Sequence, residues 1–142
     1  MQALKDYPVI FKQTVAWGDM DAFAHVNNVQ YYRYMESARI AYLQHLNIFE
    51  KEIYTVIASS NCQYLRPVLY PDVLHIGVRV EELRHSAIRM SYTLYSEQQQ
   101  TNVAQGEAVL VCLNKTSHQK TNLPDDIRQK IIALEQQVGH VL

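Results

Sequence analysis

The chain has 142 residues, of which 48 % are hydrophobic and 19 % charged, and its formal net charge at pH 7 is −1. This composition excludes an intrinsically disordered chain, and the near-neutral charge excludes a protein that binds nucleic acid over a broadly basic surface. The length predicts one domain, residues 1–142, that buries enough surface to fold without disulfides or metals.

The two cysteines, Cys62 and Cys112, lie far apart in the sequence, and we expect both thiols to be reduced and buried. No apolar stretch approaches the roughly 18 residues that a membrane-spanning helix needs. The first residues lack the apolar core of a secretory signal. Together these features predict a cytoplasmic protein with no membrane span.

The first predicted element is a strand over residues 9–17, where Phe11, Val15 and Trp17 share one parity. The next segment, residues 18–28, is polar and irregular and predicts a loop.

A long helix is predicted over residues 29–46, which contain no glycine or proline. Asn27 or Asn28 is a suitable N-cap, because a short side-chain oxygen can accept from the free amides of the first turn. Apolar and aromatic residues at helical spacing form one face: Tyr31, Met35, Ala38 and Tyr42. A second stripe beside it makes the apolar surface wide, so we expect the sheet to curl around this helix.

After the helix the hydrophobic pattern changes to period two, which indicates four successive strands joined by short turns. Their predicted ranges are 53–66, 73–83, 87–96 and 102–114. Successive strands with short connections predict an antiparallel meander. Pro124 is placed at the first turn of a final helix over residues 124–138. The predicted fold class is therefore α+β, with one long helix against an antiparallel sheet.

The loop before the long helix concentrates the groups that could carry chemistry. Asp19, Asp21, His25, Asn27 and Asn28 lie within ten positions of one another. A helix N-terminus presents free backbone N–H groups that polarise a carbonyl, and a carboxylate beside it can act as base or nucleophile. The alternative is that these residues only make turns and caps.

Residues 17–39, W-G-D-M-D-A-F-A-H-V-N-N-V-Q-Y-Y-R-Y-M-E-S-A-R, resemble the signature of the hotdog-fold acyl-CoA thioesterases of the 4-hydroxybenzoyl-CoA thioesterase family. Shorter similarities follow in the same order as in that family, at residues 63–67, 84–86, 106–108 and 114–116. The resemblance covers about residues 9–130. It implies a hotdog fold, in which an antiparallel sheet is wrapped around one long central helix.

The resemblance also implies roles for individual residues. Asp21 is implied to be the catalytic carboxylate, as base or nucleophile, and the backbone N–H near Asn28 to polarise the thioester carbonyl. His25 is either a second base or a group that holds the loop, and Asp19 orders the loop. Related enzymes carry an asparagine where this chain has Phe23, and that departure puts their three-residue mechanism in doubt.

The implied reaction is hydrolysis of an acyl-CoA to a free acid and CoA. Neither a metal nor a separate cofactor is implied, because coenzyme A is part of the substrate. Family members pair through their sheet edges, which implies a homodimer or homotetramer with active sites at the subunit boundary. The expected substrate-binding residues are Asn27, which shapes the pocket, and Arg66, whose guanidinium suits a phosphate of coenzyme A. The resemblance adds the turn formed by Arg84, His85 and Ser86, which it places near the CoA arm.

Two alternative functions remain at this point. One is another hotdog enzyme, a hydratase or dehydratase acting on enoyl or hydroxyacyl thioesters. The other is a protein that binds acyl-CoA without cleaving it. Release of free thiol distinguishes hydrolysis from both.

Overall fold

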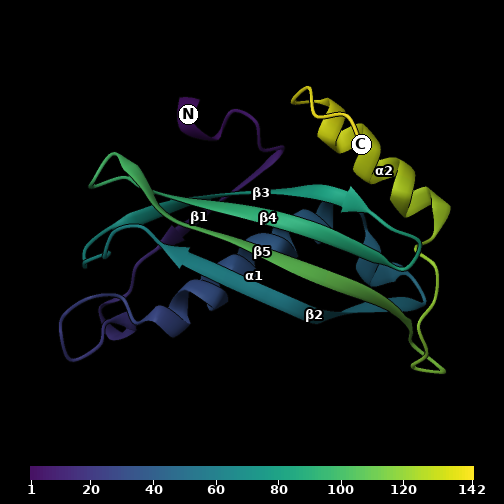
Figure 1. Cartoon of the computed structure of the whole chain (residues 1–142), viewed down its shortest axis with the longest axis horizontal. Coiled ribbons are helices and arrows are strands. Elements are labelled where there is room, and N and C mark those ends of the chain that lie inside the picture. Colours follow the sequence, from purple (N-terminus) through teal and green to yellow (C-terminus); the bar gives the residue numbers. More distant parts are fainter.

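The computed structural model describes all 142 residues and shows a five-stranded antiparallel sheet with one long helix, α1 (Asn28–His45), packed on one face. A second helix, α2 (Asp125–Gln136), lies beside the sheet at the C-terminal end of the chain (Figure 1). The α+β prediction is therefore confirmed. The strands are β1 (Val9–Thr14), β2 (Ile53–Tyr64), β3 (Val73–Leu83), β4 (Ala87–Ser96) and β5 (Thr101–Asn114).

The strand order in the sheet is β1-β3-β4-β5-β2. Strands β3, β4 and β5 form the expected meander, but β2 pairs with β5 and not with β3, with Ile53 opposite Asn114. The prediction of four strands in one meander is therefore wrong for β2. Its connection to β3 contains Pro67 and Pro71 and is too long for a tight hairpin turn, so β2 takes the free edge of β5.

The first strand is shorter than predicted and ends at Thr14. Residues Trp17–Asp19 form a short 3₁₀ helix, η2, whose geometry is fixed by a hydrogen bond from the backbone N–H of Ala16 to the Asp19 carboxylate (3.0 Å). The side chain of Asp19 therefore competes with strand pairing and turns the chain away from the sheet.

Asn27 is the N-cap of α1, as predicted, and its side-chain oxygen accepts a hydrogen bond from Val29 N–H (3.1 Å). The predicted apolar face of α1 is buried against the sheet. At Gly106 of β5 the two come so close that a Cβ atom there would lie 2.6 Å from the sulfur of Met35. The second stripe is open at its start, since Val29 is 65 % and Tyr32 39 % exposed. The sheet therefore surrounds less of the helix than the apolar pattern suggested.

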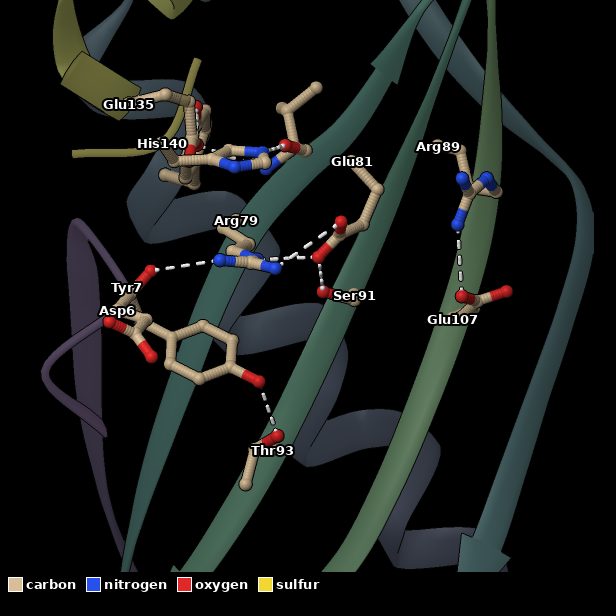
Figure 2. A network of polar contacts seen from close by, with 12 residues as sticks. Asp6, Tyr7, Arg79, Glu81, Arg89, Ser91, Thr93, Glu107, Glu135 and His140 are labelled. Atoms are coloured by element: carbon tan, nitrogen blue, oxygen red, sulfur yellow. Dashed lines mark hydrogen bonds and ion pairs between the residues drawn. The ribbon is translucent and has the colours of Figure 1, made fainter. Parts of the chain in front are cut away.

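The outer face of the sheet, away from α1, is polar (Figure 2). Arg79 pairs with Glu81 on β3, and Arg89 pairs with Glu107 across β4 and β5 (3.0 Å). These side chains alternate with the buried residues of the same strands, so one face carries the core and the other is polar. The Tyr7 ring covers part of the polar face, where Gly77 and Thr93 are buried.

Helix α2 begins one residue later than predicted. Pro124 is extended (φ −55°, ψ 142°) and is the N-cap, so Asp125 is the first helical residue. The carboxylates of Asp125 and Asp126 lie in the first turn, where they interact favourably with the positive end of the helix dipole. Neither α1 nor α2 has the length and hydropathy needed to cross a membrane.

Candidate active site

The loop between η2 and α1 is a narrow turn whose two sides are hydrogen bonded to each other. Met20 and Val26 form an antiparallel bridge, and Asp21 N–H donates to the carbonyl of His25 (2.8 Å). Ala24, with φ of 60°, adopts the left-handed conformation that reverses the chain. Asp21 therefore lies at the start of a closed, well-defined turn.

The Asp21 carboxylate is half engaged by this turn. Its Oδ1 accepts hydrogen bonds from Phe23 N–H (2.8 Å) and, more weakly, from His25 N–H (3.4 Å). Its Oδ2 has no partner in the chain. The backbone thus fixes the orientation of Asp21 and leaves one carboxylate oxygen available.

That carboxylate lines a cavity of about 310 Å³ at the N-terminus of α1. The cavity brings together residues from the loop, the helix and the segment after β2. The polar and aromatic lining residues are Asp21, His25, Asn28, Tyr31, Tyr64 and Arg66. Four residues singled out in the sequence, Asp21, His25, Asn28 and Arg66, therefore meet in one place.

Asn28 contributes its backbone N–H, which has no acceptor within the chain. The cap supplied by Asn27 serves Val29 N–H, and the Asn27 carbonyl accepts from Gln30 N–H (2.9 Å). The amide of Asn28 is left at the positive end of the helix dipole, beside the cavity. It is a donor suited to a developing negative charge on a substrate oxygen.

Two tyrosines form one wall of this cavity. The rings of Tyr31 and Tyr64 pack edge to face with centroids 4.9 Å apart, and Tyr64 Oη–H donates to the Asn28 carbonyl (2.9 Å). Burial, together with the neighbouring Cys62, raises the pKa of Tyr64 to about 12, so its phenol is a neutral donor. Tyr64 belongs to one of the short segments that resemble the family, but its bond to Asn28 joins positions too distant for any spacing pattern to reveal.

Both cysteines are free thiols, as expected, but only Cys112 is fully buried. Cys62 is half-buried because β2 stands at the edge of the sheet, so the expectation of full burial is wrong for this residue. Desolvation still raises the pKa of Cys62, which holds it in the protonated form. The carboxylate of Asp21 is therefore a better candidate than this neighbouring thiol.

Asp19 lies two residues before Asp21 and has a different environment. Its Oδ2 accepts hydrogen bonds from Tyr34 Oη–H (2.5 Å) and Ala16 N–H (3.0 Å). Asp19 does not line the cavity. Its contacts agree with the expected role in ordering the loop.

Two of the expected substrate-binding groups lie elsewhere. Asn27 does not line the cavity, and its side-chain oxygen is used by the helix cap. The Arg84–Ser86 turn follows Leu83, the last residue of β3. Val73, at the opposite end of that strand, is about 33 Å from Leu83 at the rise of a strand. Arg84 there pairs with Glu82 (3.0 Å), and Ser86 bonds Asn122 (3.1 Å). A single chain thus does not bring this turn to Asp21, and its binding of CoA stays a prediction.

No group of three or more histidine, cysteine, aspartate or glutamate side chains is arranged to hold a metal ion. The polar groups of the cavity are one carboxylate, one imidazole, one guanidinium, one side-chain amide, two phenols and the free backbone N–H at the start of the helix.

The family model described as the thioesterase-like superfamily matches residues 15–131. The long-chain acyl-CoA thioesterase FadM of Escherichia coli is 28 % identical over 116 residues, which cover 79 % of this chain and 88 % of FadM. The uncharacterized protein YsmA of Bacillus subtilis is 30 % identical over 123 residues, covering 85 % of this chain and 83 % of YsmA.

Among solved structures, a thioesterase from Thermus thermophilus, complexed with coenzyme A and zinc, superposes with a TM-score of 0.83. It is 36 % identical, and the match covers 92 % of this chain and 97 % of that one. The hotdog arrangement of sheet and central helix is thus confirmed.

Proposed function

Since the chain belongs to the thioesterase-like superfamily and is a thioester hydrolase, we propose that it cleaves acyl-CoA thioesters at the Asp21 cavity. One observation carries the proposal: the Asp21 carboxylate and the unpartnered N–H of Asn28 line the same cavity at the N-terminus of α1. A base or nucleophile and an oxyanion donor are the two groups that attack on a thioester carbonyl requires.

In the proposed reaction the thioester oxygen accepts a hydrogen bond from Asn28 N–H as negative charge develops on it. Asp21 then acts in one of two ways. As a base it removes a proton from water, whose oxygen bonds to the carbonyl carbon while the C–S bond breaks and the thiolate takes a proton. As a nucleophile its carboxylate oxygen bonds to the carbonyl carbon, the C–S bond breaks, and CoA leaves as a thiolate that takes a proton. Water then hydrolyses the acyl–aspartyl anhydride to the free acid and the Asp21 carboxylate.

His25 has two parts with different roles. Its backbone N–H and carbonyl both bond Asp21, so the residue holds the catalytic turn. Its ring lines the cavity without a hydrogen bond in the chain. This arrangement supports an orienting role for the backbone and leaves the imidazole free to exchange a proton with substrate or water.

We place the acyl group in a groove between α1 and β2. Two cavities of about 330 and 270 Å³ lie along this side of the helix and share Glu36, Arg39 and Ile57 in their walls. The first is lined near its start by Val29 and Tyr32, the exposed part of the second stripe of α1. Just over half of the lining residues are hydrophobic, and a groove of this size suits an acyl chain whose path passes the charged pair Glu36 and Arg39. The similarity to the acyl-CoA thioesterase FadM and to a thioesterase complexed with coenzyme A supports an acyl-CoA as the substrate.

We also propose that two copies pair through β2 and that two such dimers can pack as a homotetramer. Strand β2 is twelve residues long, stands at the sheet edge, and is exposed from Val56 to Asn61. Such an edge is a template for pairing with another strand. In a dimer the Arg84–Ser86 turn of one copy becomes available to the site of the other, as binding of the CoA arm requires.

The deciding experiment measures free-thiol release from a series of acyl-CoA chain lengths. Asp21→Asn keeps the size of the side chain and removes its charge, so turnover should fall at least about a hundredfold. Asp6→Asn, which changes an exposed aspartate outside the site, is the control. Hydrolysis by Asp21→Asn at the wild-type rate would disprove the assignment. Double-bond hydration without thiol release, or saturable binding alone, would support the other two functions.

A single turnover in ¹⁸O-labelled water tests whether Asp21 acts as the nucleophile. If water attacks the aspartyl carbonyl of an anhydride, one labelled oxygen remains in the Asp21 carboxylate and is detected by peptide mass spectrometry. General-base catalysis places the label in the released acid alone, as does attack of water on the acyl carbonyl of an anhydride, so label in Asp21 is the outcome that identifies the nucleophile.

A further inference from the structure

Tyr34 lies in the second turn of α1 with its ring buried, only 2 % exposed. Its hydroxyl donates to Asp19 Oδ2 at 2.5 Å, a bond between residues 15 positions apart. Tyr34 does not line the Asp21 cavity, so it has no direct contact with the reacting atoms. Its one polar contact is with the loop that carries Asp21.

Asp19 holds that loop in place through three hydrogen bonds. Its carboxylate binds Tyr34 and Ala16, and its backbone carbonyl accepts from Asn27 N–H (2.9 Å). These bonds tie the start of the loop to its end and both to the helix. The Met20–Val26 bridge lies just inside them, and Asp21 is the next residue. The position of Asp21 relative to Asn28 therefore depends on where Asp19 is held.

Of the groups that bond Asp19, the Tyr34 hydroxyl is the one that belongs to a residue of the packed interior. Ala16 and Asn27 belong to the same connecting segment as Asp19, whereas the Tyr34 ring is part of the hydrophobic core. Burial and the Asp19 carboxylate both raise the pKa of Tyr34, so the phenol keeps its proton and donates. A buried phenol without an acceptor would be unfavourable, which gives the pair a single geometry.

We propose that Tyr34 is a positioning residue for hydrolysis: through its hydrogen bond to Asp19, it holds the 18–26 loop so that the Asp21 carboxylate faces the Asn28 amide. The proposal rests on the proposed function of Asp21. It predicts an effect on the catalytic step and not on binding, because Tyr34 contacts neither the cavity nor the acyl groove.

The test compares two tyrosines of α1. Tyr34→Phe removes the bond to Asp19, and Tyr42→Phe removes a matching bond from Tyr42 to the Glu135 carboxylate (2.6 Å) at the other end of the helix. Both rings are buried, so both variants should lose similar thermal stability. Tyr34→Phe should lower kcat about tenfold or more with KM changed less than about twofold, because a small misplacement of a catalytic group is costly. Tyr42→Phe should leave kcat unchanged.

Two variants of Asp19 test the same link from its other side. Asp19→Asn keeps an oxygen that can accept from Tyr34 and should retain most of kcat. Asp19→Ala also removes the bond from Ala16 N–H, so its kcat should be at least as low as that of Tyr34→Phe. The double variant Tyr34→Phe/Asp19→Ala should be no slower than Asp19→Ala, since the Tyr34–Asp19 bond is already absent there. If Tyr34→Phe does not fold, full kcat in Asp19→Ala would still overturn the proposal.

Equal kcat for Tyr34→Phe and Tyr42→Phe would overturn the proposal, as would a change in KM alone or a multiplied loss in the double variant. These results are separate from the test of Asp21. An inactive Asp21→Asn with a fully active Tyr34→Phe removes only the positioning role. A fully active Asp21→Asn removes the proposed mechanism, whatever Tyr34→Phe does.

Discussion

Tyr34 and Tyr42 lie two turns apart on the buried side of α1, and each donates a short hydrogen bond to a carboxylate from another part of the chain. At the N-terminal end the acceptor is Asp19, which is partly exposed and belongs to a loop. At the C-terminal end it is Glu135 of α2, which is fully buried. The same kind of hydrogen bond therefore holds the loop of the proposed active site at one end of the helix and the helix α2 at the other.

The end of α1 near Glu135 has more buried hydrogen bonds than the end near Asp19. Glu135 Oε2 accepts from both Tyr42 Oη–H and Val80 N–H (3.0 Å), and His140 bonds the Val80 carbonyl (2.9 Å; Figure 2). Strand β1 ends its pairing with β3 at Val9 opposite Val78, so these side chains replace the missing strand neighbour. The loop at the other end has fewer contacts and faces a cavity. The contacts of Glu135 therefore fix the C-terminal end of α1 to α2 and β3. At the N-terminal end, α1 in turn holds the loop through the Tyr34–Asp19 bond.

The largest effect on stability is expected at the Glu135 end of α1. Glu135→Ala leaves the Tyr42 hydroxyl and Val80 N–H buried without an acceptor, and the free energy of unfolding should fall by about 3 kcal/mol. Urea denaturation at neutral pH measures the loss. The rate of thiol release by the folded fraction should be unchanged. A large fall in that rate would mean that the two ends are not separate.

The pH dependence of stability gives the next effect. Burial holds the pKa of Glu135 above its ordinary value, against the opposing hydrogen bonds from Tyr42 and Val80. The folded state therefore keeps a proton that the unfolded state releases, and the free energy of unfolding falls as pH rises from the ordinary pKa of a glutamate through the raised one. The slope in this window is at most about 1.4 kcal/mol per pH unit.

Glu135→Gln keeps the acceptor oxygen without the charge and should flatten this slope. His140 and Arg79 are the basic groups near the carboxylate, and both are present in the variant. Glu50→Gln, which removes an exposed carboxylate without an ion pair, is the matched control. Equal slopes for wild type and Glu135→Gln would show that the buried carboxylate does not govern this dependence.

A smaller effect is expected at the site end of the helix. Asn27→Ala removes the cap on Val29 N–H and should cost about 1 kcal/mol, while Asn27→Ser retains an acceptor and should cost less. Circular dichroism during urea unfolding measures both variants. A loss as large as that of Glu135→Ala would show that the loop end is as important to stability as the α2 end.

Features encoded by neighbouring residues could be predicted from the sequence. The alternation of apolar and polar residues in β3 and β4 reflects one face in the core and one polar face of the sheet. The observed ends of both strands match the predicted ones. The Asn27 cap is likewise local. The neighbour of β2 was predicted wrongly, because strand pairing is decided by contacts between distant residues and the 65–72 connection carries no hairpin signal.

The site shows the same division. Asp21, His25 and Asn28 are close in sequence, so their grouping was visible in the loop itself. The bonds Tyr34–Asp19 and Tyr64–Asn28 depend on the path of the chain in space. Glu135 is similar, because its burial follows from the point at which β1 stops pairing with β3, and the α2 sequence does not reveal this.

The cover that α2 gives to β3 has a consequence for how copies of the chain can associate. At one side of the sheet β1 is only six residues long, and beyond it Val80 is already occupied by Glu135 and His140. At the other side β2 is long and free. Since the edge of β1 offers six residues and that of β2 twelve, strand-to-strand addition favours β2. Two molecules paired through β2 leave only the short β1 edges exposed, which limits growth into open-ended fibres.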